Sequence, residues 1–105
     1  MAERNLQSVS EKSGVRKSLN FQSASTVRQK ITVDGSDHAV TLTNPHVVCN
    51  SQNTGATIAL KLLGESAFMT EYFAAGQERV MHVVAVGSTT EGSDSGTVVV
   101  IRGVD

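Results

Sequence analysis

The sequence predicts a single small all-β domain preceded by an extended N-terminal arm. A length of 105 residues gives room for one domain. From residue 26 onward, short stretches rich in Val, Ile and Thr alternate with turn signals, and no segment keeps a sustained helical period. We therefore expect a small antiparallel sandwich, jelly-roll-like, with about six or seven strands in residues 26–105.

The expected strands follow these stretches along the chain. The first covers residues 26–33 and stops at the turn signal of residues 34–36. The second covers residues 38–43 and ends at Asn44-Pro45, because proline cannot donate to a central ladder. Further strands are expected at 46–49, 56–62, 67–74, 79–86 and 97–102.

Alternation within these strands predicts which side chains share a face. In residues 56–62, one face carries Ile58, Leu60 and Leu62. In residues 67–74, one face carries Phe68, Thr70 and Tyr72, and the other carries Met69, Glu71 and Phe73. The last two strands are nearly continuous apolar runs, which is typical of strands covered on both faces.

The N-terminal residues 1–25 differ from the rest of the chain. They are polar, and their few apolar residues are spaced as in neither a helix nor a strand. Alone, such a segment cannot bury enough apolar surface to offset the entropy lost on ordering. We expect this arm to lie on a surface, either its own body or, by preference, a neighbouring subunit.

Charge is divided between the arm and the body. Residues 1–30 hold six basic and two acidic residues, whereas residues 31–105 hold three basic and eight acidic ones. Such segregation indicates that the two parts meet different surroundings. We expect the arm to bind a protein partner through Leu6, Val9, Arg16, Lys17, Leu19 and Phe21.

Nucleic acid is the less favoured partner of the arm. Its basic residues are dispersed and interrupted by Glu3 and Glu11, and no row of aromatic residues could stack bases. No apolar run is long enough for a signal peptide or a membrane span, so we expect a protein made in a reducing cytoplasm that binds no membrane. Cys49 stands alone and is expected to pack in the core.

The polar residues predict no catalytic, cofactor or metal site. His38, His46 and His82 with Cys49 lack the close pairs typical of zinc ligands, and His46 and Cys49 fall on opposite faces of a strand. The acidic loop residues are too few for the six to eight oxygens that calcium requires. No nucleophile elbow or phosphate loop is present, so we expect a protein that is not an enzyme.

A series of landmarks extends from about Ile31 to Gly103. The landmarks are the turn at 34–37, the alternating segment 40–45, Phe-Ala-Ala-Gly at 73–76, the Val-rich strand ending at 86–90, and the closing strand at 97–101. In this order they resemble a family of small structural proteins of tailed-phage virions.

The resemblance implies a jelly-roll-like sandwich that serves as a capsid decoration (cement) protein or lies at the head–tail neck. It implies a major capsid protein or another virion protein as partner, a homotrimer as the favoured oligomer, and the virion as the location. It carries over no catalytic residue. A tail or spike component, a glycan- or ligand-binding module with Tyr72 as its amphipathic ring, and a hydrolase remain as alternatives.

Overall fold

The computed structural model describes residues 25–104, and this part of the chain forms eight strands. The all-β class is confirmed, with one or two strands more than expected. The strands are β1 (Val27–Thr32), β2 (His38–Ala39), β3 (Pro45–Asn50), β4 (Ala56–Leu62), β5 (Met69–Phe73), β6 (Glu78–Val80), β7 (Val83–Val86) and β8 (Val98–Gly103). A 3₁₀ turn, η2 (Thr89–Glu91), lies between β7 and β8.

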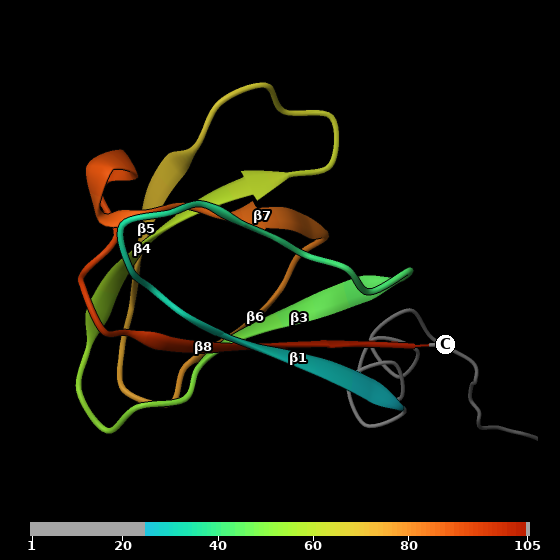
Figure 1. The fold of residues 1–105 in the computed structure, drawn as a ribbon. Coiled ribbons are helices and arrows are strands. Elements are labelled where there is room, and N and C mark those ends of the chain that lie inside the picture. The colour runs from blue at the N-terminus through green and yellow to red at the C-terminus, as the bar shows by residue number, and fades with distance from the viewer. Residues whose placement is uncertain (1–24, 105) are drawn as a thin grey trace, which may run out of the picture.

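The strands form two antiparallel four-stranded sheets that face each other (Figure 1). Sheet A has the order β1-β8-β3-β6, and sheet B has the order β2-β7-β4-β5. The first strand pairs with the last, the second with the last but one, and so inward to β4 with β5. The chain is therefore one long antiparallel ribbon wrapped into a sandwich, in which β3 meets β8 and β4 meets β7. This is the topology of a jelly roll.

The core lies between the two sheets and is almost entirely aliphatic. Phe73 is its one aromatic member among the described residues. The buried cluster consists of Ile31, Val33, Val48, Ile58, Leu60, Phe73, Val83, Val86, Val99 and Ile101. The register opposes Met69, Glu71 and Phe73 to Leu60, Ile58 and Ala56, which confirms the predicted faces of β5.

The expectation of one strand over residues 79–86 is wrong. The chain leaves sheet A after Val80 and enters sheet B at Val83, so Met81 and His82 form a crossover. Each crossover residue bonds to one sheet: the Met81 N–H donates to the carbonyl of His46 at 2.9 Å, and the carbonyl of His82 accepts from Leu63 N–H at 3.0 Å. The apolar run gives no signal for this change of sheet.

The segment expected as a strand over 38–43 keeps only two ladder residues, followed by a backbone bond from Val40 N–H to the carbonyl of Val84 and by contacts to a side chain of β1. The amide of Gln29 on β1 donates to the carbonyl of Ala39 at 3.1 Å and accepts from Thr41 N–H at 2.8 Å. Gln29 therefore closes the side of the sandwich where the edge strands β1 and β2 lie.

Arg79 closes the opposite side, between the edge strands β6 and β5. Its guanidinium donates to Glu71 Oε1 at 2.8 Å and to the carbonyl of Tyr72, and it lies 4.4 Å from the centre of the Phe73 ring. An inward-pointing charge at a sheet edge also discourages pairing with other strands.

The loop of residues 87–96 bonds to β4 along Thr57–Ala59, beyond the part of β4 that pairs with β7. Ser93 Oγ accepts from Ala59 N–H at 2.8 Å and donates to the carbonyl of Gly87 at 2.8 Å. Asp94 bonds to Thr57 through both its backbone N–H and its carboxylate. A Cβ at Gly87 would lie 2.9 Å from that of Ala59, so only glycine permits this close approach.

Candidate interaction surface

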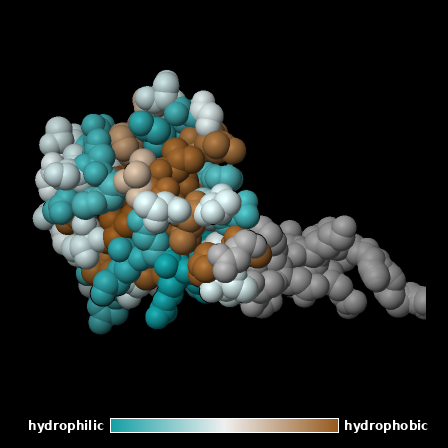
Figure 2. Space-filling view, turned by 45° about the vertical axis from the view of Figure 1, so that its right-hand side comes forward, coloured by the Kyte–Doolittle hydropathy of each residue, from teal (hydrophilic) through white to brown (hydrophobic). Residues whose placement is uncertain are grey.

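Apolar side chains are exposed at the end of the sandwich where β4 ends and the chain crosses from β6 to β7. Leu63, Met69 and Val80 are 66%, 61% and 55% exposed, and Leu62 and Met81 beside them are half-buried. We call these five residues the apolar end. Figure 2 shows hydrophobic residues gathered in a band across one face of the body. Contiguous exposed apolar residues mark interaction sites more often than isolated ones do.

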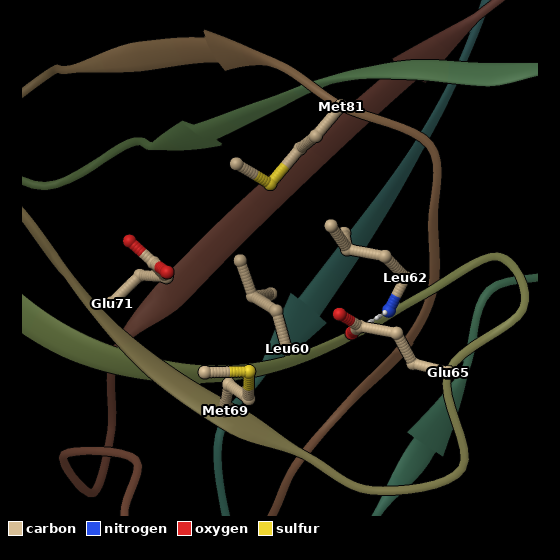
Figure 3. A pocket seen from close by; sticks show the side chains of 6 residues that line it. All are labelled: Leu60, Leu62, Glu65, Met69, Glu71 and Met81. Atoms are coloured by element: carbon tan, nitrogen blue, oxygen red, sulfur yellow. Dashed lines mark hydrogen bonds between the residues drawn. The ribbon is translucent and has the colours of Figure 1, made fainter.

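A small pocket lies within the apolar end (Figure 3). Leu60 is buried at its base, and Leu62, Met69 and Met81 surround it from β4, β5 and the crossover. The carboxylates of Glu65 and Glu71 lie at two sides of this apolar lining. The β4–β5 turn positions Glu65, since Gly64 adopts a φ of 88° and Glu65 N–H donates to the carbonyl of Leu62.

The size of the pocket limits what it can bind. Its volume is about 40 Å³, whereas small-molecule and cofactor sites occupy about 300–1,000 Å³. A space of this size admits the end of one apolar side chain rather than a sugar ring or a cofactor. Two of its walls are methionines, whose flexible thioethers adapt to the shape of an incoming group.

The two carboxylates at the pocket differ in their partners. Glu71 pairs with Arg79, so its charge is compensated. Glu65 Oε1 accepts from Leu62 N–H at 2.9 Å, and within residues 25–104 no cation pairs with it. A carboxylate can accept several hydrogen bonds, so Glu65 keeps the capacity to bind a basic side chain.

Two further hollows lie on the described body. One, of about 270 Å³, is lined by Asn44, Pro45, His46, Val80, Met81 and His82, and it shares Met81 with the pocket. The other, of about 290 Å³, is lined by Arg102 and residues 25–28. Ser25 Oγ in the lining of the second hollow lies 3.0 Å from His46 Nε2 in the lining of the first.

The histidines do not come together in the described structure. His38 Nε2 lies 2.8 Å from Asp34 Oδ1, His46 is buried beside Ser25, and His82 is exposed at the crossover. Between residues 25 and 104, no three His, Cys, Asp or Glu side chains are grouped in a way that could hold a metal ion.

The acidic loop residues bond to backbone N–H groups. Asp34 accepts from Ser36, and Asp37 accepts from Ser88, each at 2.9 Å. The hydrogen bond from Ser36, with a smaller effect of His38, lowers the pKa of Asp34. Asp34 therefore stabilises its own turn, whereas Asp37 ties this turn to Ser88 in a distant loop.

Cys49 does not pack in the core as expected. The inward position in this part of β3 belongs to Val48, and alternation places Cys49 half-buried on the outer face of sheet A. Burial, with a smaller effect of the Glu78 carboxylate, raises the pKa of the Cys49 thiol. A raised pKa is the opposite of what an activated nucleophilic thiolate requires.

The predicted binding residues of the arm, Leu6, Val9, Arg16, Lys17, Leu19 and Phe21, lie outside the described residues. In residues 25–104, no helix has the length and hydrophobicity needed to cross a bilayer. Comparison with protein-family models, with curated proteins and with solved structures gave no match.

Sequence reasoning missed the pocket. Alternation places Leu60 and Met69 on inward faces, but it does not reveal that β5 pairs with β4 in the register that opposes them. Met81 was assigned to the middle of a strand, so its position at the mouth of the sandwich could not be foreseen. The exposed Leu63 beside the Gly64-Glu65 turn was the one local signal.

Proposed function

We propose that this chain is a non-enzymatic structural protein of a phage particle, of the capsid decoration (cement) class. The observation that carries the proposal is the apolar end, where Leu63, Met69 and Val80 are exposed and where Met69 lines a pocket too small for a metabolite. Such a surface suits a protein partner.

The jelly-roll topology and the sequence resemblance support the same class. Viral capsid domains, lectins and cupins share this architecture, so topology alone does not separate them. The described residues gather no set of metal ligands of the kind that cupin chemistry uses. The small apolar pocket has no room for a sugar, so a lectin would have to use one of the two larger hollows.

In the proposed mechanism the sandwich is a compact knob within a homo-oligomer, a trimer by preference. Its arm, residues 1–25, docks on the major capsid protein or on another neighbouring virion subunit. Leu6, Val9, Leu19 and Phe21 would act as apolar anchors, each contributing about 1.5–3 kcal/mol before the cost of ordering. Arg16 and Lys17 would meet acidic partner groups, and repetition over many copies gives avidity.

Co-sedimentation with purified heads and tails of the phage tests this function. The full chain should sediment with heads, and a variant lacking residues 2–25 should remain at the top of the gradient. Circular dichroism must first confirm that the shortened variant keeps its β structure. Binding to tails alone would place the protein at the neck, tail or spike. Binding to neither part would contradict the virion function, and full binding after the deletion would contradict the role of the arm.

A further inference from the structure

We infer that the ring of Phe21 occupies the hollow beside Pro45 and Val80 on its own body, so that the last part of the arm is fixed where it joins the sandwich. The segment concerned is residues 18–24, which lead directly into Ser25 and which we call the arm root. This assignment rests on the proposed function, because it divides the arm between its own body and the virion partner.

The contact of Ser25 gives the direction from which the arm root arrives. Thr26 N–H donates to the carbonyl of Gly103 at 2.9 Å, so the chain is still paired with β8 at this point. One residue earlier, Ser25 Oγ lies 3.0 Å from Nε2 of His46 on β3. Since β8 lies between β1 and β3 in sheet A, this contact crosses the end of β8 (Figure 1). Ser25 therefore reaches towards the strand whose His46 lines the hollow.

The outer face of sheet A is covered next to this contact. Strand alternation puts Val48 in the core and Val47 on the outer face. A residue on the outer face of an antiparallel sheet ordinarily meets solvent, yet Val47 is fully buried. Other groups therefore pack over the outer face beside His46, and the arm root joins the body at this covered surface.

The hollow suits an aromatic ring. Its volume is about 270 Å³, whereas the small pocket at the apolar end admits only the end of one side chain. Pro45, Val80 and Met81 give its lining an apolar part, and Val80 is 55% exposed among the described residues. Aromatic side chains bury larger apolar areas than other residues do, so a ring is well suited to cover this surface.

Charge agrees with this placement. No charged residue lies between Lys17 and Arg28 in the sequence. The lining of the hollow likewise contains no Lys, Arg, Asp or Glu. An uncharged segment therefore meets a surface without acidic or basic groups of these types, and no ionised side chain has to lose its water. The four basic residues of the arm all precede the root and stay available for acidic groups of a partner.

The chain between Phe21 and Ser25 is long enough for this contact. The two residues are four positions apart, and four residues of extended chain span about 13 Å. The lining of the hollow begins at the histidine that Ser25 touches. Phe21 is thereby assigned to its own body, and Leu6, Val9 and Leu19 remain as anchors for the virion partner.

The sequence contains no tryptophan, so a single introduced indole reports on its own surroundings. Phe21→Trp places this probe in the arm root, and Val9→Trp places the same probe in the distal arm as the matched control. We expect the indole at position 21 to emit at shorter wavelength and to be quenched less by acrylamide than the indole at position 9. Equal emission and equal quenching of the two proteins would overturn the proposal.

A charge in the lining tests the position of the ring. In the Phe21→Trp background, Val80→Asp puts a carboxylate into the hollow, and Leu63→Asp puts one at an exposed residue outside it. Val80→Asp should shift the emission to longer wavelength, whereas Leu63→Asp should not. Circular dichroism checks that both keep their β structure, and His82→Asp at the exposed crossover takes the place of Val80→Asp if that protein unfolds. Equal emission of the two charged variants, or a shift with Leu63→Asp alone, would overturn the hollow as the site.

Subunit mixing separates the chain's own arm from the arm of another copy. The protein carrying Phe21→Trp and the charged hollow is refolded with an excess of the native chain, whose hollow is intact and which has no indole. If each root binds its own body, the native hollows are already filled, and the emission stays at the longer wavelength. A return to the shorter wavelength would show that roots exchange between copies and would overturn the proposal.

Stability gives a readout that does not depend on the indole. Phe21→Ala removes the ring, and the apolar surface of Val80 and Met81 then returns to water. The urea midpoint of the body should fall for Phe21→Ala and stay unchanged for Val9→Ala, with both followed by circular dichroism. An unchanged midpoint for Phe21→Ala would contradict a packed ring.

The outcome is separable from that of the proposed function. If the indole at position 21 is exposed while the full chain still sediments with heads, only the placement of the arm root is wrong. If the indole is buried but neither heads nor tails bind the protein, the arm root is placed correctly and the virion function is wrong.

Discussion

Arg79 combines three contacts that hold the two sheets together on one side. It pairs with Glu71, donates to the carbonyl of Tyr72 and covers the Phe73 ring. Surface ion pairs alone contribute little, with a median below about 1 kcal/mol. The hydrogen bond to the Tyr72 carbonyl and the contact with the Phe73 ring add to the stabilisation by the ion pair. Both are lost when the guanidinium is removed.

We therefore predict that Arg79→Met lowers the free energy of unfolding by about 1–2 kcal/mol. The methionine keeps much of the apolar contact with Phe73 but none of the hydrogen bonds. Urea denaturation followed by circular dichroism measures the effect. Arg28→Met on the exposed face of β1 is the control and should change the midpoint little. Equal effects of the two substitutions would show that Arg79 does not join the sheets.

The lowered pKa of the Asp34 carboxyl predicts how the stability of the folded protein changes at acidic pH. Its pKa is lower in the folded protein than the ordinary value of 3.8, because Ser36 N–H and then His38 favour the carboxylate. The resulting stabilisation is fully present above the unfolded pKa and is lost as the pH falls through the folded pKa. The urea midpoint of the native protein should therefore fall more steeply than that of Asp34→Asn between about pH 4.5 and 2. Parallel curves for the two proteins would contradict this.

The loop of residues 87–96 is not a strand, but it forms hydrogen bonds with the backbone of Thr57 and Ala59 on β4. Ser93 satisfies the N–H of Ala59 in the buried interior of sheet B. Removing this acceptor leaves a buried donor unsatisfied, which costs about 1–3 kcal/mol.

Ser93→Ala should therefore raise the hydrogen-exchange rate of the Ala59 amide more than the rates of the β1–β8 amides. Two-dimensional NMR exchange spectra give both sets of rates in one experiment. Ser95→Ala, in the same loop but exposed, should leave the Ala59 rate as it is. A uniform rise across both sheets would indicate global loss of stability instead.

Strand positions were predictable to the extent that local signals set them. The turn at 34–36 and the full span of β4 appear where the sequence predicts them, because Asp and Gly at turns and alternation in a strand are local properties. The division of residues 79–86 was not predictable, since no Gly, Pro, Asn or Asp separates the two halves and only the partner sheets differ. The short β2 was not predictable either, since Gln29 from β1 binds the carbonyl of Ala39 and the N–H of Thr41.

The candidate surface depends on the whole molecule, and this is why sequence alone did not locate it. Leu60 and Met69 face each other in the β4–β5 hairpin, and Met81 from the crossover meets them only because the ribbon wraps. The arm anchors, by contrast, were predicted from sequence alone, and they stay a prediction because they lie outside residues 25–104.

Solution mass tests the expected oligomer. Light scattering of the full chain should give three times the monomer mass. If contacts of the arm hold the trimer together, removal of residues 2–25 should yield monomers that retain the circular dichroism spectrum of the full chain. A shortened protein that remains a trimer would place the oligomer interface in the β body instead.

The position of Ser25 and Val104 has a practical consequence for anyone who would use this protein as a carrier. Both lie at the end of sheet A where β1 begins and β8 ends (Figure 1), with Thr26 bonded to Gly103 and Val104 to Asn44. A guest protein fused after residue 105 would crowd the same end as the arm. Asn53 lies in the exposed β3–β4 loop at the opposite end of the sandwich. Vaccine epitopes or fluorescent labels spliced in there would face away from Ser25, where the arm joins the body.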